Sequence, residues 1–126
     1  MALRCLLVDN DARFLESAKL LLTREGVEVD TAVSGAQALH RIGVLRPDVV
    51  LLDIHLGTES GFSVVCDIHA AWPTDGSSES GASIILISTY SEGDYKRLIE
   101  VSPALGFISK SSLSAHAIRE VLGRRG

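Results

Sequence analysis

Several side chains that can handle a phosphoryl group stand directly after short apolar runs of the sequence. They are Asp9, Asn10, Asp11, Asp53, Ser88, Thr89 and Lys110. Carboxylates are ligands that magnesium prefers, a hydroxyl can donate a hydrogen bond to a phosphoryl oxygen, and an ammonium group supplies positive charge. If the fold brings these positions together, they form a magnesium-dependent site for phosphoryl transfer.

Asp53 is the candidate nucleophile of this set. It follows "DVVLL", so a strand would fix its backbone and present its carboxylate to phosphorus. Attack on a phosphoryl group brings two anions together, and magnesium and Lys110 would offset that repulsion. The sequence has no glycine-rich phosphate loop, which argues against a nucleotide substrate.

Each of these residues also has a plainer interpretation. Asp9 to Asp11 suit the N-cap of a helix, because Asp and Asn are favoured there. Asp53 and Ser88 would both be ordinary at the end of a strand, and Lys110 could be a solvated charge. The functional interpretation therefore depends on the elements that place these residues.

Three apolar runs, 5–8, 49–52 and 84–87, are too short for helices and are rich in branched side chains. They predict strands that are buried on both faces of a parallel sheet. Two weaker strands are expected, in "VEVDTA" from Val27 and in "LGFIS" from Leu105. The alternation of apolar and polar residues in "VEVDTA" is typical of an edge strand.

A helical pattern follows each predicted strand. The first contains Phe14, Ala18, Leu21 and Leu22 and stops near Gly26; the second has capping-box spacing at Ser34 and Gln37, continues through Ala38, Ile42 and Leu45, and ends before Pro47. The third contains Phe62, Val65, Ile68 and Trp72, the fourth runs from about Gly93 to Val101, and the fifth contains Leu113, Ile118, Val121 and Leu122. This order predicts an α/β fold with a doubly wound parallel sheet, whose ligands bind at the carboxyl ends of the strands.

Length and composition favour one soluble domain. The chain has 126 residues, 46% of them hydrophobic, and a formal net charge of −4, which gives no electrostatic reason to expect direct contact with nucleic acid. No apolar stretch approaches the roughly 18 residues of a membrane span and no signal peptide stands out, so we expect a cytoplasmic protein. Cys5 and Cys66 are expected as small buried hydrophobes, and the histidines (His40, His55, His69 and His116) lack metal-ligand spacing and are expected at the surface.

The segments "LLDIHLGTESG", "ILIST" and "GFISK", together with Asp9, resemble the receiver (CheY-like) domain of bacterial two-component response regulators over essentially the whole chain. The resemblance implies a flavodoxin-like sheet of five strands in the order 2-1-3-4-5, with five helices. It also implies roles for individual residues: Asp53 as phospho-acceptor, Ser88 and Lys110 as catalytic partners, Ser88 and Phe107 as switch residues, His55 and Tyr90 as tuners of phosphoryl lifetime, and Gly61 as the glycine eight residues after the acceptor.

The same resemblance implies a cofactor and partners. Mg²⁺ would be held by Asp9, Asp53 and the backbone carbonyl of His55, with Asn10 or Asp11 as a further ligand. A histidine kinase or phosphotransfer protein would donate the phosphoryl group. A downstream protein or an effector domain elsewhere would carry the output, and a homodimer through the fourth helix, fifth strand and fifth helix is compatible with the family.

The sequence departs from the family pattern at three positions. Asn10 replaces a second acid, which removes a negative charge beside the expected metal and predicts weaker magnesium affinity, and Gly57 and Ser111 stand where the family often has proline. The polar loop 74–83 is also a few residues longer than usual, at little cost in stability.

From these observations we expect residues 1–126 to form a single receiver domain without an effector domain. It would be a signalling switch that catalyses only its own phosphorylation and dephosphorylation. Asn10 leaves a second hypothesis open, an interaction module of receiver fold that works without phosphorylation. A third, an aspartyl-nucleophile phosphatase, is weaker because such enzymes need an acid two residues after the nucleophile, where this chain has His55.

Overall fold

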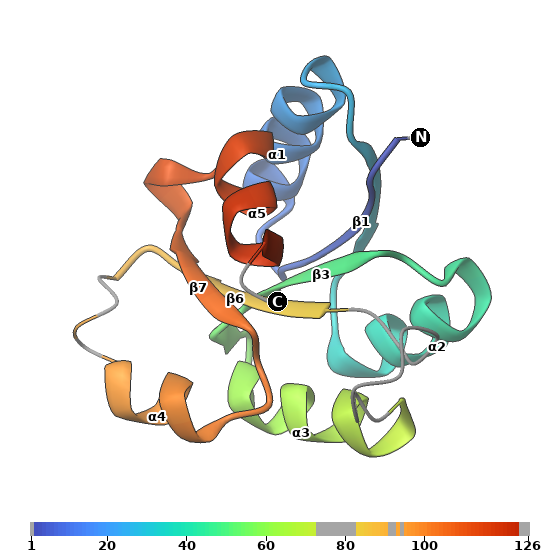
Figure 1. The fold of residues 1–126 in the computed structure, drawn as a ribbon. Helices are drawn as coiled ribbons and strands as arrows, with labels where there is room; N and C mark the ends of the chain where they lie inside the picture. The colour runs from blue at the N-terminus through green and yellow to red at the C-terminus, as the bar shows by residue number, and fades with distance from the viewer. Residues whose placement is uncertain (1, 73–82, 91–92, 94, 124–126) are drawn as a thin grey trace.

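A parallel sheet of five strands forms the centre of the protein in the computed structural model, which describes residues 2–72, 83–90, 93 and 95–123. The strands are β1 (Arg4–Val8), β2 (Glu28–Ala32), β3 (Val49–Asp53), β6 (Ser83–Ser88) and β7 (Gly106–Ser109). They pair in the order β2-β1-β3-β6-β7, which confirms the predicted order 2-1-3-4-5 (Figure 1). Of the predicted loop 74–83, only Ser83 lies within the described residues.

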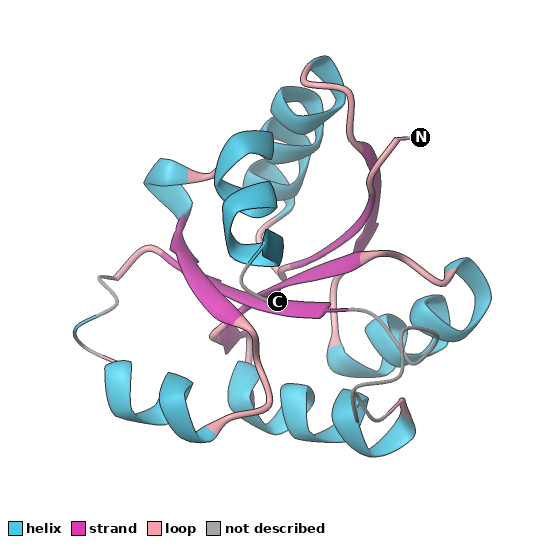
Figure 2. Ribbon diagram, in the orientation of Figure 1, coloured by secondary structure: helices cyan, strands magenta, loops and turns pink. Residues whose placement is uncertain are grey.

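Helices cover both faces of this sheet, as Figure 2 shows. They are α1 (Ala12–Arg24), α2 (Gly35–Leu45), α3 (Gly61–Ala71), α4 (Lys96–Val101) and α5 (Ala115–Leu122), with the short 3₁₀ helix η2 (Lys110–Ser112) before α5. One face carries α1 and α5, and the other carries α2, α3 and α4 (Figure 1). The five predicted helices and the doubly wound arrangement are thus confirmed.

The sheet separates two hydrophobic clusters, because successive side chains of a strand point to opposite faces. The first cluster lies under α1 and α5 and includes Leu7, Leu51 and Ile118. The second lies under α2, α3 and α4 and includes Leu6 and Leu52. The central strands therefore read as continuous apolar runs, since both of their faces are buried.

Side-chain caps fix where four helices, α1, α2, α3 and α5, begin. Asp11 caps α1, because its Oδ1 accepts hydrogen bonds from the N–H groups of Arg13 (3.0 Å) and Phe14 (3.3 Å). The predicted capping box of α2 forms in part. Ser34 Oγ accepts a hydrogen bond from Gln37 N, but Gln37 Oε1 accepts one from the N–H of Val33 instead of that of Ser34. These bonds satisfy backbone donors that have no partner within the helix.

The structure corrects several details of the predicted helices. Leu21 is 43% exposed, because Leu15, Ala18 and Leu22 form the buried stripe of α1 and Leu21 lies beside it. The fourth helix begins at Lys96 rather than near Gly93, since the preceding residue has non-helical dihedral angles and makes no capping bond.

Other corrections concern residues expected in a helix or in the core. Leu113 is buried but precedes α5, and Cys66 lies exposed on the outer side of α3. Cys5 is buried as expected, and His69 is half-buried rather than fully solvated. Neither cysteine forms a disulfide.

A small hairpin between β3 and α3 was absent from the predicted elements. Its strands are β4 (His55–Leu56) and β5 (Glu59–Ser60), and Gly57 opens the two-residue turn with φ +63°. A positive φ at the first turn position suits glycine and excludes proline, whose ring holds φ near −65°. Proline at position 57 would therefore not fit this turn.

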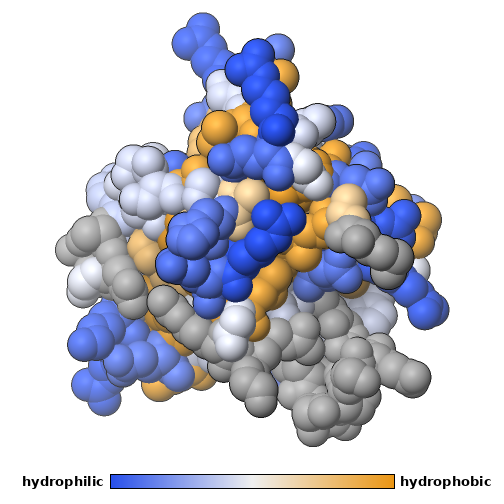
Figure 3. Space-filling view, turned by 45° about the horizontal axis from the view of Figure 1, so that its top comes forward, coloured by the Kyte–Doolittle hydropathy of each residue, from blue (hydrophilic) through white to orange (hydrophobic). Residues whose placement is uncertain are grey.

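The surface mixes polar and apolar side chains. On the face shown in Figure 3, hydrophilic residues lie between areas of exposed hydrophobic surface. In the described part of the chain, no helix combines the length and apolar character needed to span a lipid bilayer.

Candidate functional site

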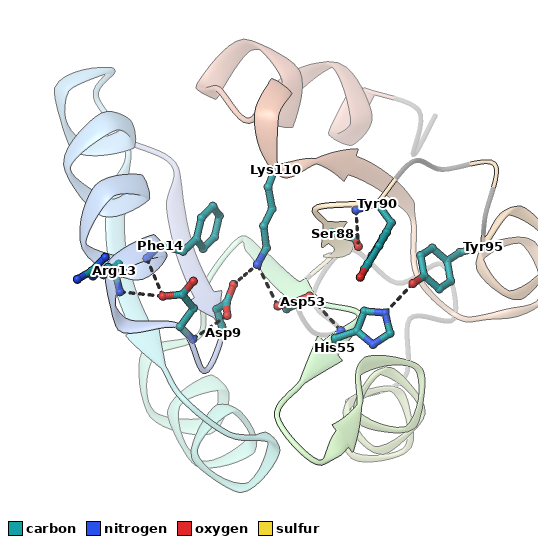
Figure 4. A network of polar contacts seen from close by, with 10 residues as sticks. Asp9, Arg13, Phe14, Asp53, His55, Ser88, Tyr90, Tyr95 and Lys110 are labelled. Carbon is teal, nitrogen blue, oxygen red and sulfur yellow. Dashed lines mark hydrogen bonds and ion pairs between the residues drawn. The ribbon is translucent and has the colours of Figure 1, made fainter.

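Strand register brings the predicted site residues to one edge of the sheet. Val8 lies beside Leu52, so the residues that follow them, Asp9 and Asp53, are neighbours. Ser88 pairs with Ser109, which directly precedes Lys110. Figure 4 shows the side chains of Asp9, Asp53 and Lys110 turned toward one another at this edge.

Lys110 bridges the two aspartates. Its Nζ lies 2.6 Å from Asp9 Oδ2 and 3.0 Å from Asp53 Oδ2, and it stands 4.3 Å from the centre of the Phe14 ring. The Asp9 and Asp53 side chains are almost completely buried, at 1% and 7% exposure. Two carboxylates thus share one ammonium group away from bulk water, and this trio leaves one negative charge in excess.

Burial and charge act on the protonation of this trio in opposite ways. Burial raises the pKa of Asp9, and the nearby Asp53 adds to that rise, while the close ammonium group of Lys110 and the hydrogen bond from the N–H of Asp11 offset it only in part. For Lys110, burial alone would lower the pKa, but its bonds to Asp9 and Asp53 outweigh burial and raise it. The ammonium form is therefore strongly favoured.

Gly61 fixes the backbone of Asp53. A β-carbon at position 61 would clash with the backbone oxygen of Asp53 and would lie 2.7 Å from Ile54 Cα, both parts of the main chain. The N–H of Gly61 also donates a 2.7 Å hydrogen bond to Ile54 O. The glycine eight residues after the acceptor therefore allows α3 to begin against the end of β3.

Ser88 lies buried on β6 with its hydroxyl oxygen accepting a 3.0 Å hydrogen bond from the N–H of Tyr90. That bond uses a lone pair and leaves the hydroxyl proton available as a donor. Thr89, the next residue, is exposed. Phe107 on β7 is half-buried and packs against the cluster under α2, α3 and α4.

The acidic stretch after β1 divides into separate roles. Asp9 enters the trio, and Asp11 caps α1, so the helix-cap interpretation is right for one residue and wrong for the other. Asn10 is exposed, and its Nδ2 would lie 3.2 Å from a β-carbon placed on Gly57. The amide thus lies next to the turn of the β4–β5 hairpin.

Glu59 also holds that hairpin in place. Its Oε2 accepts a 3.1 Å hydrogen bond from the N–H of Gly35, the first residue of α2. A carboxylate at a helix N-terminus is favourable both as an acceptor and through the helix dipole. The segment from His55 to Glu59 is therefore held at its start by the bond from His55 N to Asp53 and at its end by the bond to Glu59.

An aromatic cluster borders the trio and includes residues that the sequence patterns did not single out. His55 Nε2 lies 2.6 Å from the hydroxyl of Tyr95, and edge-on ring contacts join His55 to Tyr90 and Tyr95, each with centroids 5.7 Å apart. Phe62 contacts Tyr95 at 6.3 Å. We call the trio the charged half of the site and this cluster, His55, Phe62, Tyr90 and Tyr95, the aromatic half.

The carboxylate oxygens of the charged half suit a divalent cation. Asp9 Oδ2 is buried and accepts no well-formed hydrogen bond from the described residues, so its ion pair with Lys110 is its partner there. Within the same residues no three His, Cys, Asp or Glu side chains converge. A hard cation would therefore bind the two carboxylates and complete its oxygen shell with a backbone carbonyl and waters.

The sequence also matches a known family and several known proteins. Residues 5–122 match the family described as response regulator receiver domain. The transcriptional regulatory protein PrrA of Mycobacterium leprae is 42% identical over 67 residues, which are 53% of this chain and 29% of PrrA. The DNA-binding response regulator MtrA of Mycolicibacterium paratuberculosis is 35% identical over 88 residues, 70% of this chain and 36% of MtrA. The chain thus spans about a third of the length of these curated relatives.

A solved structure agrees over nearly the whole chain. The crystal structure of response regulator protein TrrA from Thermotoga maritima, in complex with Mg²⁺-BeF, is 30% identical. Its TM-score is 0.75, and the match covers 97% of each chain.

Proposed function

The chain belongs to the response regulator receiver domain family, and we propose that it takes a phosphoryl group onto Asp53 from the phosphohistidine of a histidine kinase or phosphotransfer protein. Members of this family are phospho-accepting switches of two-component signalling. The observation that carries the proposal is the bridge of Lys110 between Asp9 and Asp53, whose side chains are almost completely buried where three strands end.

The transfer is a nucleophilic displacement at phosphorus. A carboxylate oxygen of Asp53 forms the new bond to phosphorus, the bond from phosphorus to the histidine nitrogen of the donor breaks, and that nitrogen keeps the electron pair. Lys110 lies within reach to offset the charge of the incoming group, and the free hydroxyl proton of Ser88 supplies a hydrogen bond to a phosphoryl oxygen. In this proposal the chain catalyses only its own phosphorylation and dephosphorylation.

Mg²⁺ is the cofactor that the site supports. Asp9, Asp53 and the backbone carbonyl of His55 would hold it, and Asn10 would face it through an amide oxygen that brings no negative charge. When bound, Mg²⁺ supplies positive charge to the attacking and transferred oxygens. The structure of TrrA with Mg²⁺-BeF supports such binding in a relative. Asp11 is excluded from our ligand set, because its carboxylate caps α1.

The output follows from the switch residues. We propose that Ser88 moves toward the phosphoryl group and that Phe107 turns further inward, which changes the surface formed by α4, β7 and α5. This surface would bind a downstream protein or a second copy of the chain, or act on an effector domain outside this sequence. Direct contact of residues 1–126 with nucleic acid is not part of the proposal.

A phosphorylation-independent interaction module is the second candidate, and Asn10 favours it. A phosphorylation experiment distinguishes the two functions. The protein is incubated with acetyl phosphate and Mg²⁺, and the adduct is measured by intact mass and by its lability in base. We expect a base-labile adduct of one phosphoryl group on the wild type and none on Asp53→Asn. A wild type without an adduct would reject our proposal in favour of the interaction module, and steady turnover of a phosphate ester would point to a phosphatase.

A further inference from the structure

The side chain of His55 is held by a residue from another segment of the fold. Its backbone N–H donates a 3.0 Å hydrogen bond to Asp53 Oδ1, while its ring nitrogen Nε2 lies 2.6 Å from the hydroxyl of Tyr95. Figure 4 shows the imidazole between these two residues, with the bonded nitrogen turned toward Tyr95 and away from Asp53. The main chain of His55 thus serves the charged half, and its side chain belongs to the aromatic half.

Ring contacts fix the hydroxyl that holds His55. Tyr95 stands directly before α4, and its ring contacts Phe62 on α3 at 6.3 Å and Tyr90 at 6.4 Å between centroids. An aromatic ring packed against several other rings has little freedom to rotate out of its place. The position of the Tyr95 hydroxyl is therefore set by α3 and by the segment after β6, independently of Asp53.

The direction of the imidazole affects the fate of a phosphorylated Asp53. In hydrolysis, a water oxygen bonds to phosphorus, the bond from phosphorus to the Asp53 oxygen breaks, and both water protons end on the released phosphate. An imidazole nitrogen facing the phosphoryl group would accept a hydrogen bond from that water and orient it for attack. Two residues from the acceptor, His55 is close enough in sequence to do so when its ring is free.

We propose that Tyr95 is a positioning residue that holds the His55 imidazole away from the phosphorylated Asp53 and thereby lengthens the life of the phosphoryl group. This inference rests on the proposed phosphorylation of Asp53. It differs from a role as a steric shield, because Tyr95 would act through its hydrogen bond to His55.

The substitution Tyr95→Phe tests this role, since it removes the hydroxyl and keeps the ring contacts. The proteins are phosphorylated with acetyl phosphate and Mg²⁺, freed of the donor, and followed by intact mass. We expect Tyr95→Phe to lose its phosphoryl group roughly three- to tenfold faster than the wild type, the effect of one modest hydrogen bond. In a His55→Ala background the same substitution should change the rate by less than about twofold, because the two residues act as one unit.

A second measurement reads the hydrogen bond without any phosphorylation. The ring nitrogens of His55 are observed by ¹⁵N NMR, and Tyr95→Phe should move the Nε2 signal while leaving that of His116 unchanged. An unchanged Nε2 signal, an unchanged or slower hydrolysis rate, or equal acceleration with and without His55 would each overturn the inference. If the wild type takes up no phosphoryl group, the proposed function fails and this inference fails with it, whereas the other outcomes leave the proposed function intact.

Discussion

The charged half and the aromatic half of the site lie side by side but are built in different ways. Asp9, Asp53 and Lys110 are placed by the main chain, because Asp53 ends a strand and the other two directly follow strands whose register is fixed by the sheet. His55 and Tyr95 are placed by their own side chains, which meet across two connecting segments. Residues placed by the main chain keep their positions when neighbouring side chains are substituted. Residues placed by side-chain contacts can be moved by a single substitution.

The largest expected effect concerns the main chain of the charged half. Gly61→Ala should reduce the free energy of unfolding by about 3 kcal/mol, because the added β-carbon meets the backbone of Asp53 and Ile54, which cannot give way without moving the acceptor. Denaturation by urea measures this loss. Gly123→Ala is the matched control, since a β-carbon there has no neighbour within 4 Å, and a similar loss in both variants would contradict our account.

The next effect concerns the charge deficit at position 10. Asn10→Asp should tighten Mg²⁺ binding by roughly ten- to a hundredfold, the worth of one charged contact, as measured by calorimetry. Asp11→Asn is the control, because asparagine caps a helix as well as aspartate does and the Asp11 carboxylate lies on α1. Equal changes in the two variants, or none at Asn10→Asp, would show that position 10 does not face the metal.

A smaller effect concerns stability and pH. The raised pKa of Asp9 means that its ionised form is disfavoured by folding, so Asp9→Asn should stabilise the metal-free protein at pH 7 by on the order of 1 kcal/mol. The wild type regains this stability as the pH falls through the raised pKa and Asp9 becomes protonated. The advantage of the variant should therefore shrink from pH 7 toward acid, as urea denaturation at several pH values would show. If the extra stability of Asp9→Asn stayed constant or grew toward acid pH, burial would not disfavour the ionised form of Asp9.

The smallest effect concerns the aromatic half. Tyr90 is 56% exposed and contacts the ring of His55, so we expect Tyr90→Ala to admit water and to speed loss of the phosphoryl group by roughly threefold. Tyr90→Phe keeps the ring and should leave the rate near that of the wild type. Dephosphorylation followed by intact mass would decide, and an unchanged or slower rate in Tyr90→Ala would remove Tyr90 from the set of lifetime-tuning residues.

The same contrast explains what could be predicted from the sequence. Apolar runs locate parallel strands, and parallel strands bring their carboxyl ends together, so the meeting of Asp9, Asp53 and Lys110 followed from pattern alone. The split between Asp9 in the trio and Asp11 at the start of α1 did not follow, because an aspartate suits either role.

The contact of Tyr95 with His55 could not be predicted, because forty residues separate them and no periodic pattern relates a strand end to the start of a short helix. The β4–β5 hairpin was missed for a similar reason. Its strands have two residues each, too few to show an alternation, although Gly57 before Thr58 was a usable turn signal. Phe14, by contrast, stood on a predicted helical stripe, and only its contact with Lys110 was new.

The separation of the core into two clusters limits how far a signal can spread. On β7, Phe107 packs on the side of α3 and α4, and its neighbour Ile108 packs on the side of α1 and α5. A rotation of Phe107 would therefore disturb the cluster under α2, α3 and α4 directly and reach the other cluster only through the sheet. The sheet thus separates two cores, so we expect a rotation of Phe107 to act first on α4 and to reach α5 only by way of β7.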